Sequence, residues 1–153
     1  REAGCTLLPE HHVAKIEDLN ILILHGDTLC IEDVDYQKFR RKARHPIFRW
    51  VLSHLPLKKR QQIARDWRTK SMSVNSNKSD NIMDVTTTEV ERLMEKHKVN
   101  TMIHGHTHRP NRHQHKNGER IVLGDWHHNG WYIQVTKNTP PELISFAITP
   151  QAD

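Results

Sequence analysis

The chain has 153 residues, 35% of them hydrophobic, and a mean hydropathy of -0.77, which predicts one domain with a modest core. It shows neither an apolar run near the roughly 20 residues of a membrane span nor a secretory leader, so we expect no span and no export signal. The cysteines, Cys5 and Cys30, form no CxxC pair, so we expect free thiols in a reducing compartment. Residues 38–70 hold 12 of the 23 Lys and Arg and one acid, which predicts a basic region facing an anionic partner.

The first third of the chain predicts two strands followed by helices. Residues 11–24 read as two strands around a turn, and the apolar run Ile21–Leu24 is typical of a strand buried on both faces. Asp33 or Asp35 can cap a helix that runs to about residue 44, and Pro46 suits the first turn of a second helix, which ends at residue 56. A third helix is predicted over 57–69, and a polar loop over 71–81.

The remaining elements predict a mixed α/β layer fold. Thr86 with Glu89, or Thr88 with Glu91, has capping-box spacing before a helix that runs to about residue 97. One strand is predicted over 99–103, and three more over about 120–123, 131–136 and 142–148. The order of elements indicates core segments at 1–32 and 81–153 with a helical insertion at 33–80.

Two histidine motifs each follow an apolar strand: "LILHGD", with His25, and "TMIHGHTHRP", with His104, His106 and His108. Ligands bind at the carboxyl ends of strands in open α/β sheets, and imidazole is the commonest metal ligand. In an extended run His106 and His108 would project the same way, and Gly105 would leave room for a close approach. We therefore predict His25, His106 and His108 as metal ligands, and an ordinary structural role for His104.

These motifs resemble those of a known family. "GHTH" after an earlier "HGD" resembles the last two motifs of the calcineurin-like metallophosphoesterases. The segments "ILILHGDTLCIEDVDYQKFR", "SNKSDNIMDV", "IHGHTHRP" and "IVLGDW" more narrowly resemble the UDP-2,3-diacylglucosamine pyrophosphohydrolase family of bacterial lipid A assembly. The similarity runs from about Gly4 to Ile148 and implies a layered sheet sandwich with a helical lid insertion.

The resemblance also implies a reaction and a site. A water attacks the α-phosphorus of UDP-2,3-diacylglucosamine, giving UMP and 2,3-diacylglucosamine 1-phosphate, with two metal ions, usually Mn²⁺. His25 and His106 would hold one ion and His108 the other. The residues implied to contact or lie near the substrate are Asp33, Tyr36, Ser71, Asn75, Lys78 and His106. The enzyme would lie peripherally on the cytoplasmic face of the bacterial inner membrane.

The motifs that open the family's fold are not found in their places. They are an Asp-x-His, a Gly-Asp-x-x-Asp and a Gly-Asn-[Arg/His]-Asp; Asp125-Trp126-His127 matches the first formally but follows the last histidine motif, which indicates coincidence. We therefore expect the chain to be the C-terminal portion, roughly two thirds, of such an enzyme. It should require the missing N-terminal segment as a partner and should be inactive alone.

Alternatives stay open for the basic segment and for the function. Residues 38–70 interleave aromatic and aliphatic with basic side chains, which suits a plain amphipathic cap, or a lid that takes acyl chains and meets anionic lipid heads. No RNA or DNA module appears, so we expect no nucleic-acid partner. A nucleotide-specific metallophosphoesterase or a non-catalytic histidine-metal module would also fit the motifs. An apolar-lined cavity between the helices from Asp33 to Lys70 favours a lipid, a solvent-filled groove favours a nucleotide, and a closed tetrahedral site favours the module.

Overall fold

The computed structural model describes residues 4–75 and 84–148. The chain divides into two compact units: a core unit (Arg1–Leu29 and Val85–Asp153) and a helical unit (Cys30–Asp84), within which the insertion predicted at 33–80 falls. Across the described residues, no helix is both long and apolar enough to cross a membrane.

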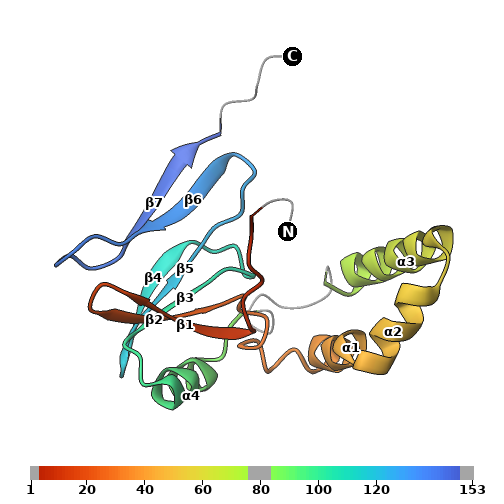
Figure 1. Ribbon diagram of the computed structural model, residues 1–153, viewed down its shortest axis with the longest axis horizontal. Coiled ribbons are helices and arrows are strands. Elements are labelled where there is room, and N and C mark those ends of the chain that lie inside the picture. The colour runs from red at the N-terminus through yellow and green to blue at the C-terminus, as the bar shows by residue number, and fades with distance from the viewer. Residues whose placement is uncertain (1–3, 76–83, 149–153) are drawn as a thin grey trace. The chain divides into compact units, whose positions relative to one another are not determined.

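The core unit is built on a five-stranded mixed sheet with the strand order β1-β2-β3-β5-β4 (Figure 1). β2, β3 and β5 run parallel, while β1 pairs antiparallel with β2 and β4 antiparallel with β5. The strands span His11–Ile16 (β1), Leu19–Leu24 (β2), Thr101–His104 (β3), Asn111–His115 (β4) and Gly118–Val122 (β5). The predicted mixed α/β class is confirmed, and the three parallel strands present their carboxyl ends at one edge of the sheet.

Apolar side chains are buried on both faces of this sheet. Leu22 and Met102 pack on one face against Val90, Leu93 and Met94 of α4 (Thr87–His97). The other face carries a second apolar cluster and the hairpin of β6 (Asn129–Gln134) and β7 (Glu142–Ala147); its members include Ile21, Ile103, Ile121, Ile133 and Leu143. Burial of each such side chain stabilises the fold by about 1.5–3 kcal/mol, so alternation along β2 and β3 fixes the layering.

Strand β4 was missed because its sequence, "NRHQH", holds no apolar residue. It pairs with β5 through a two-residue turn, with His115 opposite Gly118. Gly118 has φ +141, and a Cβ there would lie 2.0 Å from the carbonyl oxygen of Asn100, so only glycine fits. The signal present in the sequence was the Asn117-Gly118 dipeptide, a frequent hairpin marker.

Helix α4 begins where the capping-box spacing predicts, with Thr86 as its N-cap. The reciprocal side-chain bonds of the box are not formed: among the described residues Thr86 Oγ1 has no hydrogen-bond partner. Glu89 instead accepts two hydrogen bonds of 2.7 Å from Arg92. The Thr86 N–H donates to the carbonyl oxygen of Leu29 at 2.9 Å, so a tertiary main-chain bond replaces the local cap.

The helical unit contains α1 (Val34–Arg44), α2 (Pro46–His54) and α3 (Leu57–Asn75). Asp33 caps α1 as predicted, its Oδ1 accepting from the Tyr36 N–H at 3.0 Å, and Pro46 opens α2. The predicted loop over 71–81 was wrong at its start, because α3 continues to residue 75. The segment 57–75 contains no Gly or Pro, and Ser and Asn lower helix propensity only modestly.

Candidate metal centre

The two histidine motifs meet at the carboxyl ends of neighbouring strands. β2 and β3 run parallel with Leu24 opposite His104, so both strands deliver their next residues to the same edge. There the Gly105 N–H donates to the carbonyl oxygen of His25 at 3.0 Å. The main chain thus holds the two motifs together at the edge where α/β sheets bind ligands.

The side chains of His25 and His106 lie together. Their ring centroids are 5.0 Å apart with an interplanar angle of 67°; His25 is exposed and His106 half-buried. Two imidazoles at this range fit part of a metal's ligand shell, since each offers a ring nitrogen. Over residues 4–75 and 84–148, no group of three or more His, Cys, Asp or Glu side chains is arranged to hold a metal ion. The assignment of His108 therefore stays a prediction.

The backbone at the second motif differs from the expected extended run. β3 ends at His104, and both His106 (φ 66) and His108 (φ 53) are left-handed. The argument from period two was therefore wrong for this pair, since alternation holds only in extended chain. Left-handed backbone is uncommon outside glycine, but it also occurs at Glu17, Lys98 and Asn138, away from the histidine motifs. The left-handed conformation alone therefore does not identify a functional turn.

The glycine that this arrangement requires is Gly26. It has φ +112, and a Cβ there would lie 2.7 Å from His104 Nδ1 and 3.1 Å from the carbonyl oxygen of Gly105. A Cβ on Gly105 would meet nothing closer than the His25 carbonyl oxygen at 3.9 Å. The two motifs therefore approach each other most closely at Gly26, which packs against His104 and Gly105. Sequence reasoning did not single out this residue.

Behind the turn lies a buried polar chain that sequence reasoning also missed. His104 (1% exposed) and Arg120 (6% exposed) lie 3.1 Å apart between Nε2 and a terminal guanidinium nitrogen. His104 Nδ1 is 2.8 Å from the carbonyl oxygen of Gly105, and Arg120 Nε donates to His115 Nε2 at 3.3 Å. Burial, and after it Arg120, lowers the pKa of His115, which favours the neutral imidazole that can accept this bond. The available signal was an arginine inside the apolar strand "RIV".

Apart from His106, the residues implied to contact substrate belong to the helical unit. Asp33 is buried at the N-cap of α1, Tyr36 is half-buried in its first turn, and Ser71 is exposed on α3. Asn75 is the last residue of α3, and nothing of its side chain is described; Lys78 lies outside the described residues. Their roles stay predictions.

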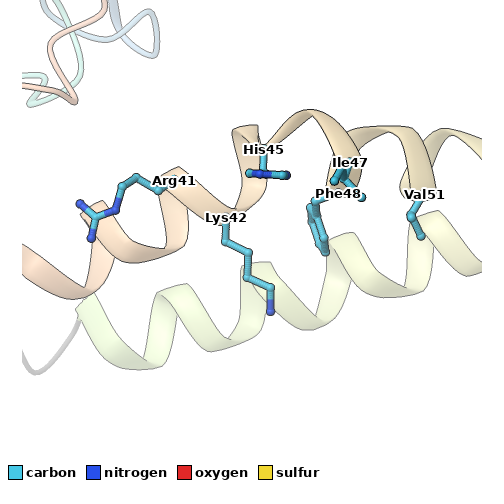
Figure 2. Close-up of a pocket in the computed structure, with 6 residues that line it drawn as sticks. All are labelled: Arg41, Lys42, His45, Ile47, Phe48 and Val51. Carbon is cyan, nitrogen blue, oxygen red and sulfur yellow. The ribbon is translucent and has the colours of Figure 1, made fainter.

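The helical unit holds an aromatic cluster and a basic pocket. The Trp67 ring lies 5.0 Å from Phe39, edge to face, and 5.8 Å from Phe48, stacked. Lys42 Nζ lies 5.7 Å from the centroid of the Phe48 ring. Beside them is a pocket of about 470 Å³ that combines cationic and apolar side chains (Figure 2); it is lined by Arg41, Lys42, His45, Ile47, Phe48 and Val51.

The helical unit also carries exposed apolar side chains, among them Ile47, Trp50 and Leu57, each more than 60% exposed. No residue of α1 or α2, both of which lie wholly within the described range, is fully buried. The pocket is open to solvent and is lined by cationic as well as apolar side chains, so the lipid role of this unit stays a prediction.

Compared with known proteins, the chain is similar to bacterial hydrolases, although no protein-family model matches it. These relatives are named UDP-2,3-diacylglucosamine hydrolase. The chain is 48% identical over 139 residues to that of Azotobacter vinelandii, which covers 88% of the chain and 58% of the relative. The relative from Pseudomonas entomophila is 47% identical over 137 residues (87% and 57%), and that from Pseudomonas syringae pv. tomato 42% over 155 residues (99% and 62%).

The narrower resemblance drawn from the motifs, to the UDP-2,3-diacylglucosamine pyrophosphohydrolase family, is confirmed by these relatives. The chain spans about three fifths of their length.

Proposed function

We propose that the chain forms part of a calcineurin-like metallophosphoesterase that hydrolyses the diphosphate of UDP-2,3-diacylglucosamine to UMP and 2,3-diacylglucosamine 1-phosphate. One observation carries the proposal. His25 and His106 lie with ring centroids 5.0 Å apart at the carboxyl ends of parallel strands, in a chain 42–48% identical to hydrolases named for that substrate. The two sequence motifs and the main-chain bond between them support a common site for these histidines.

The proposed site takes two metal ions, Mn²⁺ by family resemblance. His25 and His106 hold one ion and His108 the other, with further ligands from the remainder of the relatives' length. When bound, such ions make hydroxide available near neutral pH and stabilise charge on phosphoryl oxygens. The chain's own part is to orient His25 and His106, which the main-chain bond from Gly105 to the His25 carbonyl and the buried His104 support.

The helical unit is proposed as the lid that receives the lipid. Its aromatic cluster of Phe39, Phe48 and Trp67 offers apolar surface to acyl chains, and Asp33, Tyr36, Ser71, Asn75 and Lys78 are the proposed contacts to the rest of the substrate. The basic residues of 38–70 would meet anionic lipid heads, which supports a peripheral position on a membrane surface. The family resemblance implies the cytoplasmic face of the inner membrane. The pocket that mixes Arg41 and Lys42 with Phe48 and Val51 supports this pairing of charge with apolar surface.

A complementation experiment tests the function. The chain is assayed with Mn²⁺ for UMP release from UDP-2,3-diacylglucosamine, alone and co-expressed with the uncovered segment of the Azotobacter vinelandii relative. We expect activity only in the second case, and its loss in His106→Ala. Arg112→Met, which removes a surface arginine bonded to Glu119, is the matched control and should remain active. Equal activity without the added segment would refute the proposal that the metal ligands are divided between this chain and the added segment. Hydrolysis of UDP-glucosamine lacking acyl chains at the same rate would instead favour a nucleotide-specific enzyme.

A further inference from the structure

We propose that His104 and Arg120 act together as positioning residues for His106, by holding the peptide group that joins Gly105 to His106. This inference rests on the proposed metal role of His106. It assigns a task to two buried side chains that neither the motifs nor the names of the relatives explain.

The direction of each hydrogen bond follows from the chemistry of arginine. A guanidinium has only N–H donors, so at 3.1 Å from Arg120 the Nε2 atom of His104 must accept. In a neutral imidazole the other nitrogen then carries the hydrogen, so Nδ1 donates to the Gly105 carbonyl oxygen at 2.8 Å. Arg120 thereby selects the only neutral tautomer of His104 that can bind this carbonyl.

The bound carbonyl belongs to the peptide group that joins Gly105 to His106. Rotation about the next bond is the φ angle of His106, which is 66 and therefore in the left-handed region. A left-handed residue can relax by rotation about φ or about ψ. Fixing the plane of the preceding peptide restrains the φ rotation of His106. The N–H of Gly105 is fixed as well, through its bond of 3.0 Å to the His25 carbonyl. Both sides of Gly105 are thus tied, one to the first histidine motif and one to the buried pair.

Arg120 is itself held in plane. Its Nε donates to His115 Nε2 at 3.3 Å, and its neighbour across the strand pair is His113. Metal-binding histidines are commonly oriented by groups that do not touch the metal, and loss of such groups weakens metal affinity by about 10–100-fold. The same magnitude is expected if the peptide before His106 is released.

Two isosteric substitutions separate positioning from packing. His104→Asn places an amide nitrogen where Nδ1 lies, so it can still donate to the Gly105 carbonyl. His104→Gln places an amide oxygen where Nε2 lies, so it can still accept from Arg120 but loses the bond to Gly105. If His104 only fills space beside Arg120, Gln should be the better replacement; if it positions His106, Asn should be.

The test measures Zn²⁺ binding to the full chain by calorimetry. Only the binding that is lost in His106→Ala is assigned to the proposed site. We expect His104→Gln to weaken this affinity by roughly 10–100-fold and His104→Asn to weaken it markedly less, with Arg112→Met as a neutral control. Unfolding temperatures are measured in parallel, and the ring nitrogens of His104 are assigned by long-range ¹H–¹⁵N NMR in the unsubstituted chain.

The two hypotheses fail in different ways. Zn²⁺ binding that His106→Ala leaves unchanged would count against the proposed metal site. Site binding with equal affinity in His104→Gln and His104→Asn would overturn the positioning role. A His104 ring protonated at Nε2 rather than at Nδ1 would overturn it without any variant.

Discussion

Replacement of Gly26 by alanine should destabilise the core unit strongly. The new Cβ would lie 2.7 Å from His104 Nδ1 and 3.1 Å from the Gly105 carbonyl oxygen, and the second of these is main chain that cannot swing away. A side chain in this backbone region costs about 1–3 kcal/mol, and overpacking of a buried site costs about 1–3 kcal/mol more. The free energy of unfolding should therefore fall by about 2–6 kcal/mol, against about 5–15 kcal/mol for a typical domain.

Urea unfolding, followed by circular dichroism, measures this change. With a urea dependence of about 1–3 kcal/mol per molar, the midpoint should fall by at least about 0.7 M. Gly105→Ala is the matched control, because it adds the same methyl group in the same turn where the nearest atom is 3.9 Å away, and its φ is not positive. Equal destabilisation by the two substitutions would refute the reasoning that close packing at Gly26 holds the motifs together.

Three further predictions concern acid stability and the helical unit. Burial lowers the pKa of His11 and of His97, whose rings lie 5.6 Å apart. The stability that the neutral rings confer is therefore complete above about pH 6.5 and decreases below it, because the unfolded chain binds protons first. The urea midpoint should drop at acid pH, and it should drop less in His97→Phe. Trp67→Ala should lose helix content by circular dichroism because it removes both aromatic contacts, whereas Trp50→Ala, 63% exposed, should change little. Anionic vesicles should bind the chain more strongly than neutral ones, and glutamine at Lys58, Lys59 and Arg60 should weaken this by up to about 3 kcal/mol, while glutamine at Lys96, Lys98 and Lys116 should not. No difference between the two triple variants would leave the helical unit as a plain cap.

The elements with strong apolar periodicity could be predicted from the sequence. The run Ile21–Leu24 was identified as a buried strand because its residues pack on both faces of the sheet, and Asp33 was identified as a cap because its carboxylate acts within one turn. β4 could not be found this way, since its histidines pack beside Arg120 rather than in an apolar cluster. A strand recruited by tertiary polar contacts leaves no hydrophobic pattern.

For the candidate site, the sequence located the histidines but not the backbone that carries them. Strand ends and glycine predicted that His25 and His106 would meet, and their rings do lie together. The left-handed turn at His106 depends on bonds to His25 and His104, which come from two different strands. Contacts between strands far apart in the chain have no local signature, so the pairing of His104 with Arg120 could not be predicted from the sequence.

The chain leaves the core unit at Leu29 and returns at Val85, and these two points are joined by the hydrogen bond from the Thr86 N–H to the Leu29 carbonyl at 2.9 Å. Leu29 is fully buried in the apolar cluster that α4 covers, and Val85 packs against the same cluster. The cost of closing a loop grows only with the logarithm of its length. The segment between the two points can therefore lengthen, shorten or be replaced while the strand register stays the same. Under the proposed function, the part that contacts the lipid would then change without disturbing the part that holds the metal.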